Sequence, residues 1–301
     1  MEQTVSNLWK KEFRHTVSVL AGGFILMQLA SYFVSLAVAQ VTHAARIWLS
    51  MDAWTFINDI CLYGLGLPLL MLMSQDLPSG AKMPLRPQKA MRPKQFFRVL
   101  CISYAVVVLA NIVTTMLTSF LHGSNDLVSG MMEEISPFGG FVLMSLVPAI
   151  GEELVFRGYL YKKLIRFGEK PYIMLSALFF ATFHGNLEQA GYAFALGLWL
   201  AYLVCRTGSV VYGVMIHLFI NFLSGAVLSQ IGNTTAGGLI SYLMLAMVAA
   251  GCVFLFRLRK KLVVRPAQRP VPDAVSLAVG NLGMVLWLIL FLLLAVTSLW
   301  M

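Results

Sequence analysis

Residues 148–158 read PAIGEELVFRG and place two adjacent glutamates and an arginine inside a long apolar run. Ionised side chains are costly at membrane depth, so they are rare there and by default mark function. Glu153 and Arg157 are four residues apart, so on a helix they share one face and can neutralise each other. Glu152 points about 100° around the same helix. The segment therefore predicts one structural carboxylate and one working carboxylate.

The composition around this segment is that of a membrane protein. The chain has 301 residues, of which 59% are hydrophobic and 12% are charged, whereas about a quarter of the residues in soluble domains are charged. The net charge of +9 comes from short basic clusters between apolar runs, which is the positive-inside pattern of membrane proteins and not that of a nucleic-acid-binding surface. The four cysteines have no paired spacing, so they are predicted to be buried thiols: Cys61, Cys101, Cys205 and Cys252.

Nine apolar runs are candidates for membrane spans, since about 20 residues cross the hydrocarbon core. The fourth run contains residues 148–158, and the fifth and sixth are short, at about 14 residues each. The sequence therefore predicts an all-α, polytopic helical membrane protein with about eight to nine transmembrane helices and a motif-bearing helical core. The predicted spans are Val17–Val41, Trp54–Met73, Phe96–Leu121, Phe138–Tyr161, Pro171–His184, Gly191–Val204, Ser209–Ser229, Ala236–Phe256 and Val275–Trp300.

The expected organisation is one continuous membrane unit with three parts. Residues 1–137 are N-terminal transmembrane helices, 138–229 form the motif-bearing core, and 230–301 are C-terminal transmembrane helices. No cleavable signal peptide is expected, because the first 15 residues are polar and the apolar run after them is long enough to span. A polar turn at residues 185–190, between the two short spans, is expected to border a wet cavity.

The basic residues predict the orientation. All of the 22 Lys and Arg residues except Arg46 and Arg157 fall on the cytoplasmic side when the N-terminus is placed in the cytoplasm. An odd number of spans then leaves the C-terminus on the outer side.

Three further polar residues lie within the predicted spans. His184 closes the fifth span, and His217 and Asn221 are four residues apart in the seventh, so they share one helical face. At 1.5 Å per residue, these three and Glu152 lie roughly 15 to 22 Å from the nearest basic residue of the cytoplasmic side. Three separate spans are therefore expected to bring polar groups to one layer of the membrane.

These residue types suit hydrolytic chemistry. A glutamate away from bulk water can take a proton from a water molecule near neutral pH, and a neutral histidine beside it can hold that water. A second histidine and an asparagine on one face offer N–H donors to a developing oxyanion. The residues therefore predict a water-activating site without a metal or other cofactor. A zinc site made by Glu152, His184 and His217 is the alternative.

Each polar group also has a structural interpretation. Glu153 and Arg157 are expected to form a buried pair rather than to act directly on a substrate. His217 and Asn221 can instead be hydrogen-bonding contacts between helices, worth about 0.6 kcal/mol each. Gly197 fits the close approach of two helices.

The polar motifs resemble those of the CPBP family of intramembrane glutamic endopeptidases, also called the Abi or CAAX-protease family. The similarity rests on three motifs that follow one another in successive apolar spans, within about residues 138–229. They are Glu-Glu-x-x-x-Arg, Phe-x-x-x-His and His-x-x-x-Asn, made here by Glu152, Glu153, Arg157, Phe180, His184, His217 and Asn221.

The resemblance implies roles for these side chains. Glu152 and His184 would activate the attacking water, and His217 with Asn221 would form the oxyanion hole. No motif position departs from the family pattern. The resemblance implies an endopeptidase that acts on a membrane-associated or lipidated peptide.

The same resemblance gives Glu153 and Arg157 the role of holding the motif helix in place, with Glu153 also assisting. The expected partners are a peptide or protein substrate at the membrane and the lipid bilayer, with no nucleic acid. The expected location is a bacterial cell membrane, with a cytoplasmic N-terminus. Two alternatives remain: a non-catalytic partner of another membrane protein, such as an immunity protein or signalling scaffold, and a proton-coupled transporter, for which no inverted repeat is visible.

Overall fold

The computed structural model describes residues 2–87, 90–119 and 134–298, and these residues form helices without any strand. Within them, six helices are long and apolar enough to cross a membrane, and two shorter apolar helices, Val211–Val227 and Leu282–Ser298, accompany them. The prediction of an all-α, polytopic membrane protein is confirmed. The predicted span ends at Leu121 and Trp300, and most of the acidic loop after the third span, lie outside the described residues.

The first third of the chain forms three long helical rods. The polar N-terminal residues, expected to precede the first span, are helical from Glu2 onward, because Trp9 and Phe13 pack their rings against Phe167. Ser50 caps the second rod by accepting a hydrogen bond from the backbone N–H of Ala53. The elements are α1 (Glu2–Ala44), then α2 (Met51–Asp59), η1 (Ile60–Gly66) and α3 (Leu67–Met73) in line, then α4 (Pro93–Thr118).

The remainder of the chain contains the motifs and the C-terminal helices. Its first rod is built from α6 (Pro137–Phe141), η2 (Val142–Leu146), α7 (Val147–Glu152), η3 (Glu153–Tyr159), α8 (Leu160–Leu164) and η4 (Ile165–Phe167). After it come α9 (Glu169–Phe183), α10 (Leu187–Thr207), α11 (Val211–Ile220), η5 (Asn221–Val227), α12 (Leu228–Ile231), α13 (Thr235–Leu258), η6 (Arg259–Lys261), α14 (Ala274–Val279) and α15 (Leu282–Ser298). The segments η1, η2, η3 and η5 are π-helical.

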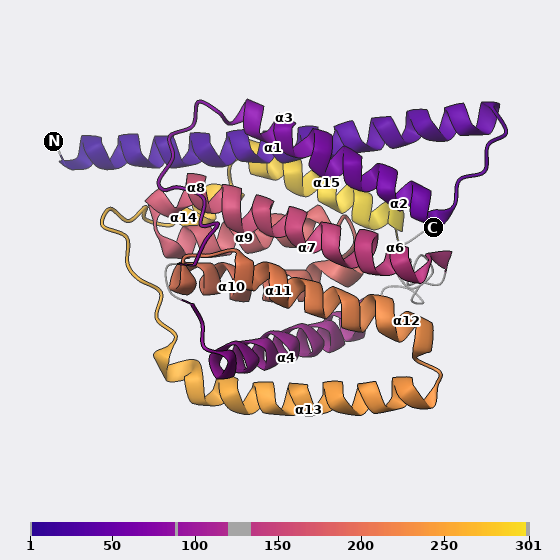
Figure 1. The fold of residues 1–301 in the computed structure, drawn as a ribbon. Coiled ribbons are helices and arrows are strands. Elements are labelled where there is room, and N and C mark those ends of the chain that lie inside the picture. Colours follow the sequence, from indigo (N-terminus) through magenta and orange to yellow (C-terminus); the bar gives the residue numbers. More distant parts are fainter. Residues whose placement is uncertain (1, 88–89, 120–133, 299–301) are drawn as a thin grey trace.

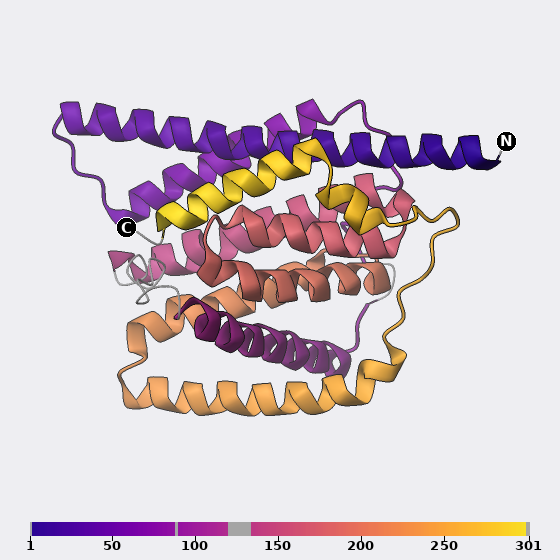
Figure 2. The same cartoon turned by 180° about the vertical axis from the view of Figure 1, so that it is seen from behind.

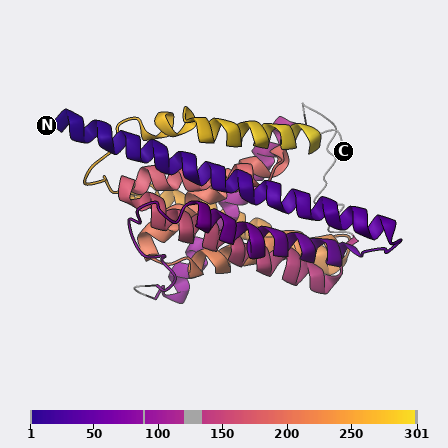
Figure 3. The same cartoon turned by 90° about the horizontal axis from the view of Figure 1, so that it is seen from above.

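The helices pack side by side in layers (Figure 1). α1 and α15 cover one side of the bundle, α9 and α10 lie inside it, and α4 and α13 close the other side, as the view from behind also shows (Figure 2). Seen from above, α1 runs between α15 and the rod of α2 and α3 (Figure 3). The N-terminal end of α1 and the C-terminal end of α15 lie at opposite ends of the bundle (Figure 1).

The rod that runs from Pro137 to Phe167 carries the charged motif and is called the motif helix. An aromatic cluster joins it to three other elements. The ring of Phe24 on α1 stacks on Phe156 of η3 and on Phe179 of α9, with ring centroids 5.5 Å and 4.7 Å apart. Trp287 of α15 lies 5.7 Å from Phe24 and donates its indole N–H to the hydroxyl of Thr182 at 2.7 Å. The cluster fixes the motif helix against α1 and α9, because rings of this size contribute most to core packing.

The structure differs from the sequence-based predictions in three details. The ninth span is broken at residues 280–281, because the Asn281 side chain accepts from the N–H of Gly283 and donates to the carbonyl of Arg14. The polar turn at 185–190 is shorter, because Asn186 caps α10, which begins at Leu187. Of the four free thiols, Cys61 and Cys101 are buried as predicted, Cys205 is half-buried and Cys252 is exposed.

Candidate active site

The motif helix buries its three charged residues at the junction of α7 and η3. Glu152 is 8% exposed, and Glu153 and Arg157 are not exposed at all. The Arg157 Nη1 donates to Glu153 Oε1 at 2.7 Å, the ion pair that the four-residue spacing predicts. The guanidinium also lies 4.1 Å from the centre of the Phe180 ring, where a cation is stabilised by the ring face.

His217 on α11 connects the two glutamates. Its Nδ1 lies 3.2 Å from Glu153 Oε1, and its Nε2 lies 3.5 Å from Glu152 Oε2. One turn earlier on α11, Gly213 leaves room for this contact, since a Cβ there would lie 2.6 Å from Glu153 Oε2. The imidazole is therefore placed between a carboxylate that is paired with arginine and one that is not.

His184 approaches the same cluster from the C-terminal end of α9. Its Nδ1 lies 2.8 Å from the carbonyl oxygen of Phe180, and the two rings meet edge to face at 5.0 Å. The Phe180 ring also meets His217 edge to face at 5.7 Å. Phe180 thus lies between the two histidines and under the guanidinium of Arg157.

Asn221 follows His217 by four residues and begins η5. Its side chain is partly buried, and within the described residues its amide makes no hydrogen bond. The structure thus brings four of the six candidate residues into direct contact, whereas no hydrogen bond in the described part of the chain joins His184 or Asn221 to them. The four are Glu152, Glu153, Arg157 and His217.

One residue of the second rod contacts this site and another lies one turn before it, and neither belongs to the sequence motifs. The Tyr63 hydroxyl on η1 donates to Glu152 Oε1 at 3.3 Å. Gly151 makes space for this ring, since a Cβ there would lie 2.5 Å from it. Asp59, one turn before Tyr63, is 8% exposed, and its Oδ2 has no hydrogen-bond partner within the described residues. The signal that could have found Asp59 is the same one that marks Glu152, an acidic residue inside a predicted span.

The zinc alternative has a geometric test. In the part of the chain that the structure describes, no three His, Cys, Asp or Glu side chains converge closely enough to hold a metal ion. A ligand set made by Glu152, His184 and His217 is therefore not preassembled.

One comparison with known proteins gave a match, and it covers the motif region. No curated protein and no solved structure gave a match. Residues 133–223, about a third of the chain, match the family model described as type II CAAX prenyl endopeptidase Rce1-like. This range contains all three motifs, and the match confirms the resemblance predicted from them. The motif-bearing segment of this chain thus matches the CPBP/CAAX protease family.

Proposed function

We propose that the chain is an intramembrane endopeptidase that hydrolyses a peptide bond of a membrane-associated or lipidated peptide. One observation carries the proposal. Glu152 has Tyr63 and His217 as partners and, among the described residues, no Lys or Arg, because the adjacent Glu153 takes the buried Arg157. A purely structural cluster would not need a second buried carboxylate that no Lys or Arg neutralises. The match to a prenyl endopeptidase family supports the same class of reaction.

His217 is proposed to be the oxyanion donor that Glu153 positions. A carboxylate paired with arginine can only accept a hydrogen bond, so the His217 Nδ1 that faces Glu153 carries a proton. A proton on Nε2 as well would give this imidazole a second donor, on the side of Glu152. Nε2–H then faces Glu152 at rest and can turn to a developing oxyanion when a substrate is bound.

His184 and Glu152 are proposed to activate the attacking water. The Phe180 carbonyl can only accept, so the Nδ1 of a neutral His184 carries the proton and Nε2 is free to accept from water. Glu152 is the carboxylate that takes the water proton. Asn221 on the same face as His217 supplies a second N–H donor through its amide.

The proposed reaction balances without a further reactant. The water oxygen attacks the peptide carbonyl carbon as its proton passes to Glu152, and the resulting oxyanion accepts hydrogen bonds from His217 and Asn221. Collapse of this intermediate breaks the C–N bond, and the leaving amine takes a proton from Glu152. Glu153 and Arg157 hold His217 and the motif helix throughout.

The test compares two Glu→Gln variants that differ only in position. Glu152→Gln removes the proposed base, and Glu134→Gln makes the same change at an exposed residue outside the cluster. Each is expressed in cells that lack the chromosomal copy, and the membrane peptides are quantified by mass spectrometry. An uncut peptide is expected to accumulate with Glu152→Gln but not with Glu134→Gln or wild type.

The peptide that accumulates also identifies the class of substrate. General acid–base groups contribute about 10²–10⁴-fold to rate, so the accumulated peptide is expected to be cleaved at least about 100-fold more slowly by Glu152→Gln. A lipid modification on that peptide would assign the chain to lipidated substrates. If a normally folded Glu152→Gln variant leaves the peptides unchanged and complements fully, the chain is a non-catalytic membrane partner.

A further inference from the structure

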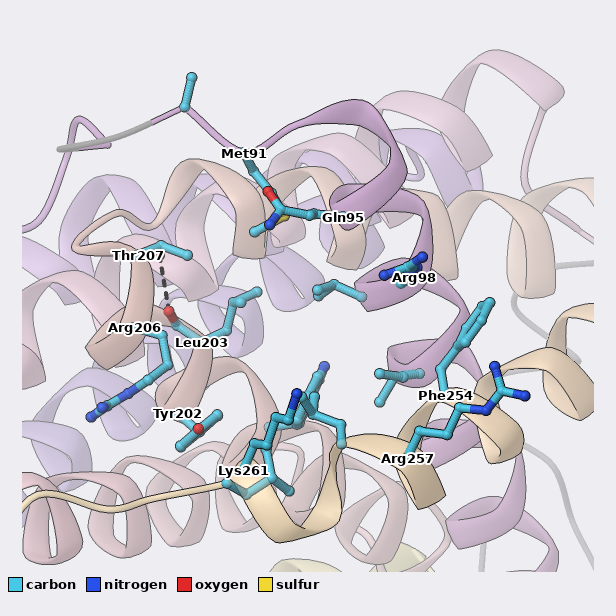
Figure 4. Close-up of a pocket in the computed structure, with 16 residues that line it drawn as sticks. Met91, Gln95, Arg98, Tyr202, Leu203, Arg206, Thr207, Phe254, Arg257 and Lys261 are labelled. Atoms are coloured by element: carbon cyan, nitrogen blue, oxygen red, sulfur yellow. Dashed lines mark hydrogen bonds between the residues drawn. The ribbon is translucent and has the colours of Figure 1, made fainter.

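A pocket of about 720 Å³ lies between the ends of three helices (Figure 4). The first turns of α4, the last turns of α10 and the end of α13 line it. Neither the two glutamates nor the histidines of the candidate active site border it. The pocket is therefore a separate feature that the proposed peptidase reaction does not use.

Four cations from these three helices surround the pocket: Arg98, Arg206, Arg257 and Lys261. Figure 4 shows Arg98 on α4, Arg206 on α10, and Arg257 and Lys261 at the end of α13. Arg206 forms an ion pair with Glu169. The other three take part in no ion pair with any residue that the structure describes. Their uncompensated positive charge favours an anionic ligand.

The walls of the pocket are apolar and aromatic. Ile102, Leu203 and Leu258 line it together with the rings of Trp199 and Phe254. The most apolar 18-residue window of the α13 segment, which forms one wall, has a mean hydropathy of 2.4, and only 17% of this window is buried inside the protein. The exposed apolar face of α13 is suited to the hydrocarbon of a bilayer, so a ligand would enter this pocket sideways from the lipid.

We propose that this pocket binds an anionic phospholipid. The phosphate would sit among Arg98, Arg257 and Lys261, and the first part of an acyl chain would lie along Leu258 and Phe254 between α4 and α13. Basic pockets between transmembrane helices are a known kind of site for anionic headgroups. A free phosphate ion shares the charge but would gain nothing from the apolar walls, so the lipid is the better match.

The test uses two double variants with the same charge change on the same stretch of chain. Arg257→Gln with Lys261→Gln removes two cations that line the pocket, and Arg259→Gln with Lys260→Gln removes two neighbours that do not. All four side chains are exposed, so both variants are expected to fold. Purified full-length protein in detergent is titrated with phosphatidylglycerol and, separately, with phosphatidylcholine, and bound lipid is counted by native mass spectrometry.

Wild type and the Arg259/Lys260 variant are expected to bind phosphatidylglycerol in preference to phosphatidylcholine. One basic residue near an anionic lipid surface contributes about fivefold, so the Arg257/Lys261 variant is expected to lose about 25-fold in phosphatidylglycerol affinity. Arg98→Gln, which removes a pocket cation from a different helix, is expected to lose about fivefold. Phosphatidylcholine binding is expected to stay unchanged in all of them.

Two results would overturn the proposal. An equal loss in both double variants would show that lipid preference follows overall surface charge rather than this pocket. A third titration uses inorganic phosphate alone and follows competition with phosphatidylglycerol. If millimolar phosphate displaced the lipid and bound with the same dependence on Arg257 and Lys261, the site would be one for a free anion and not for a phospholipid.

Discussion

Glu152 and Glu153 are adjacent in the chain but have different surroundings. Glu153 pairs with Arg157 at 2.7 Å and contacts His217, whereas Glu152 accepts from the hydroxyl of Tyr63 and faces the other nitrogen of His217. One step along a helix turns a side chain by about 100°, enough to send neighbours to different partners. At the scale of single residues, the two carboxylates are therefore expected to respond differently to substitution.

Arg157 is expected to be a residue on which stability depends. Arg157→Met leaves the buried Glu153 without its cation, and removing one partner of a buried pair costs about 3–5 kcal/mol. Adding Glu153→Gln removes the stranded charge, so the double variant is expected to recover most of the lost stability. Thermal unfolding of the purified proteins in detergent measures both. A double variant no more stable than Arg157→Met would mean that the pair does not act as a unit.

Tyr63 is expected to act on the reaction rather than on the fold. Tyr63→Phe keeps the ring against Gly151 but removes the hydrogen bond to Glu152. If that bond orients the base, the variant should cleave the substrate at least about tenfold more slowly with its thermal midpoint nearly unchanged. Tyr32→Phe, at an exposed position, is the matched control. Equal cleavage rates for both variants would show that the Tyr63 hydroxyl has no role in the reaction.

At the scale of elements, the candidate site coincides with interruptions of regular α-helix. Tyr63 lies in η1, Glu153 and Arg157 lie in η3, and η5 begins at Asn221; all three segments are π-helical. π-helical turns are rare and frequently occur at functional sites. The apolar runs predicted the helices that contain these segments, but run length and composition do not report the extra residue in a turn. The sequence could therefore locate the motifs but not the local backbone that aims them.

Several predicted span boundaries differ from the helix ends in the structure, for identifiable reasons. The fifth and sixth spans were expected from apolar residues alone, so the prediction stopped short of the polar ends that α9 and α10 include, such as Glu169 and Arg206. The break at Asn281 depends on a hydrogen bond to the carbonyl of Arg14, which is distant in sequence. Tyr63 reaches Glu152 only because the second rod packs beside the motif helix. The local sequence pattern could not predict these contacts between segments that are distant in the chain.

The contact between α9 and α10 can be tested by substitution. It fixes the position of His184 and of the turn that joins the two helices. A Cβ on Gly197 would lie 2.8 Å from the Cα of Ala177, so Gly197→Ala must push the helices apart. Overpacking of this kind costs about 1–3 kcal/mol. Gly238→Ala on α13 is the control, since a Cβ there meets nothing within 4 Å. The expected result is a lower thermal midpoint for the first variant alone; equal midpoints would show that the two helices can separate without cost.

At the scale of the whole molecule, the charge pattern of the sequence and the arrangement of the helices agree. The basic clusters belong to the start of α1, the start of α4, the segment from α8 to the start of α9, and the end of α13, and these parts lie together at one end of the bundle (Figure 1). The loop between α1 and α2 lies at the opposite end (Figure 1). By the positive-inside rule, we propose that the basic end faces the cytoplasm.

This orientation can be measured with two variants, each of which carries one introduced cysteine in a chain whose four native cysteines have been replaced. Trp48, which is 95% exposed, lies in the loop between α1 and α2, and the exposed Lys260 lies in η6 at the other end. A membrane-impermeant maleimide should label Trp48→Cys in intact cells and Lys260→Cys only after permeabilisation. Because Lys260 adjoins Lys261, which lines the pocket, the same result would place the proposed phospholipid site in the cytoplasmic leaflet, where anionic lipids give the surface its negative potential. The reverse labelling would invert the topology and leave those cations facing a surface without that potential.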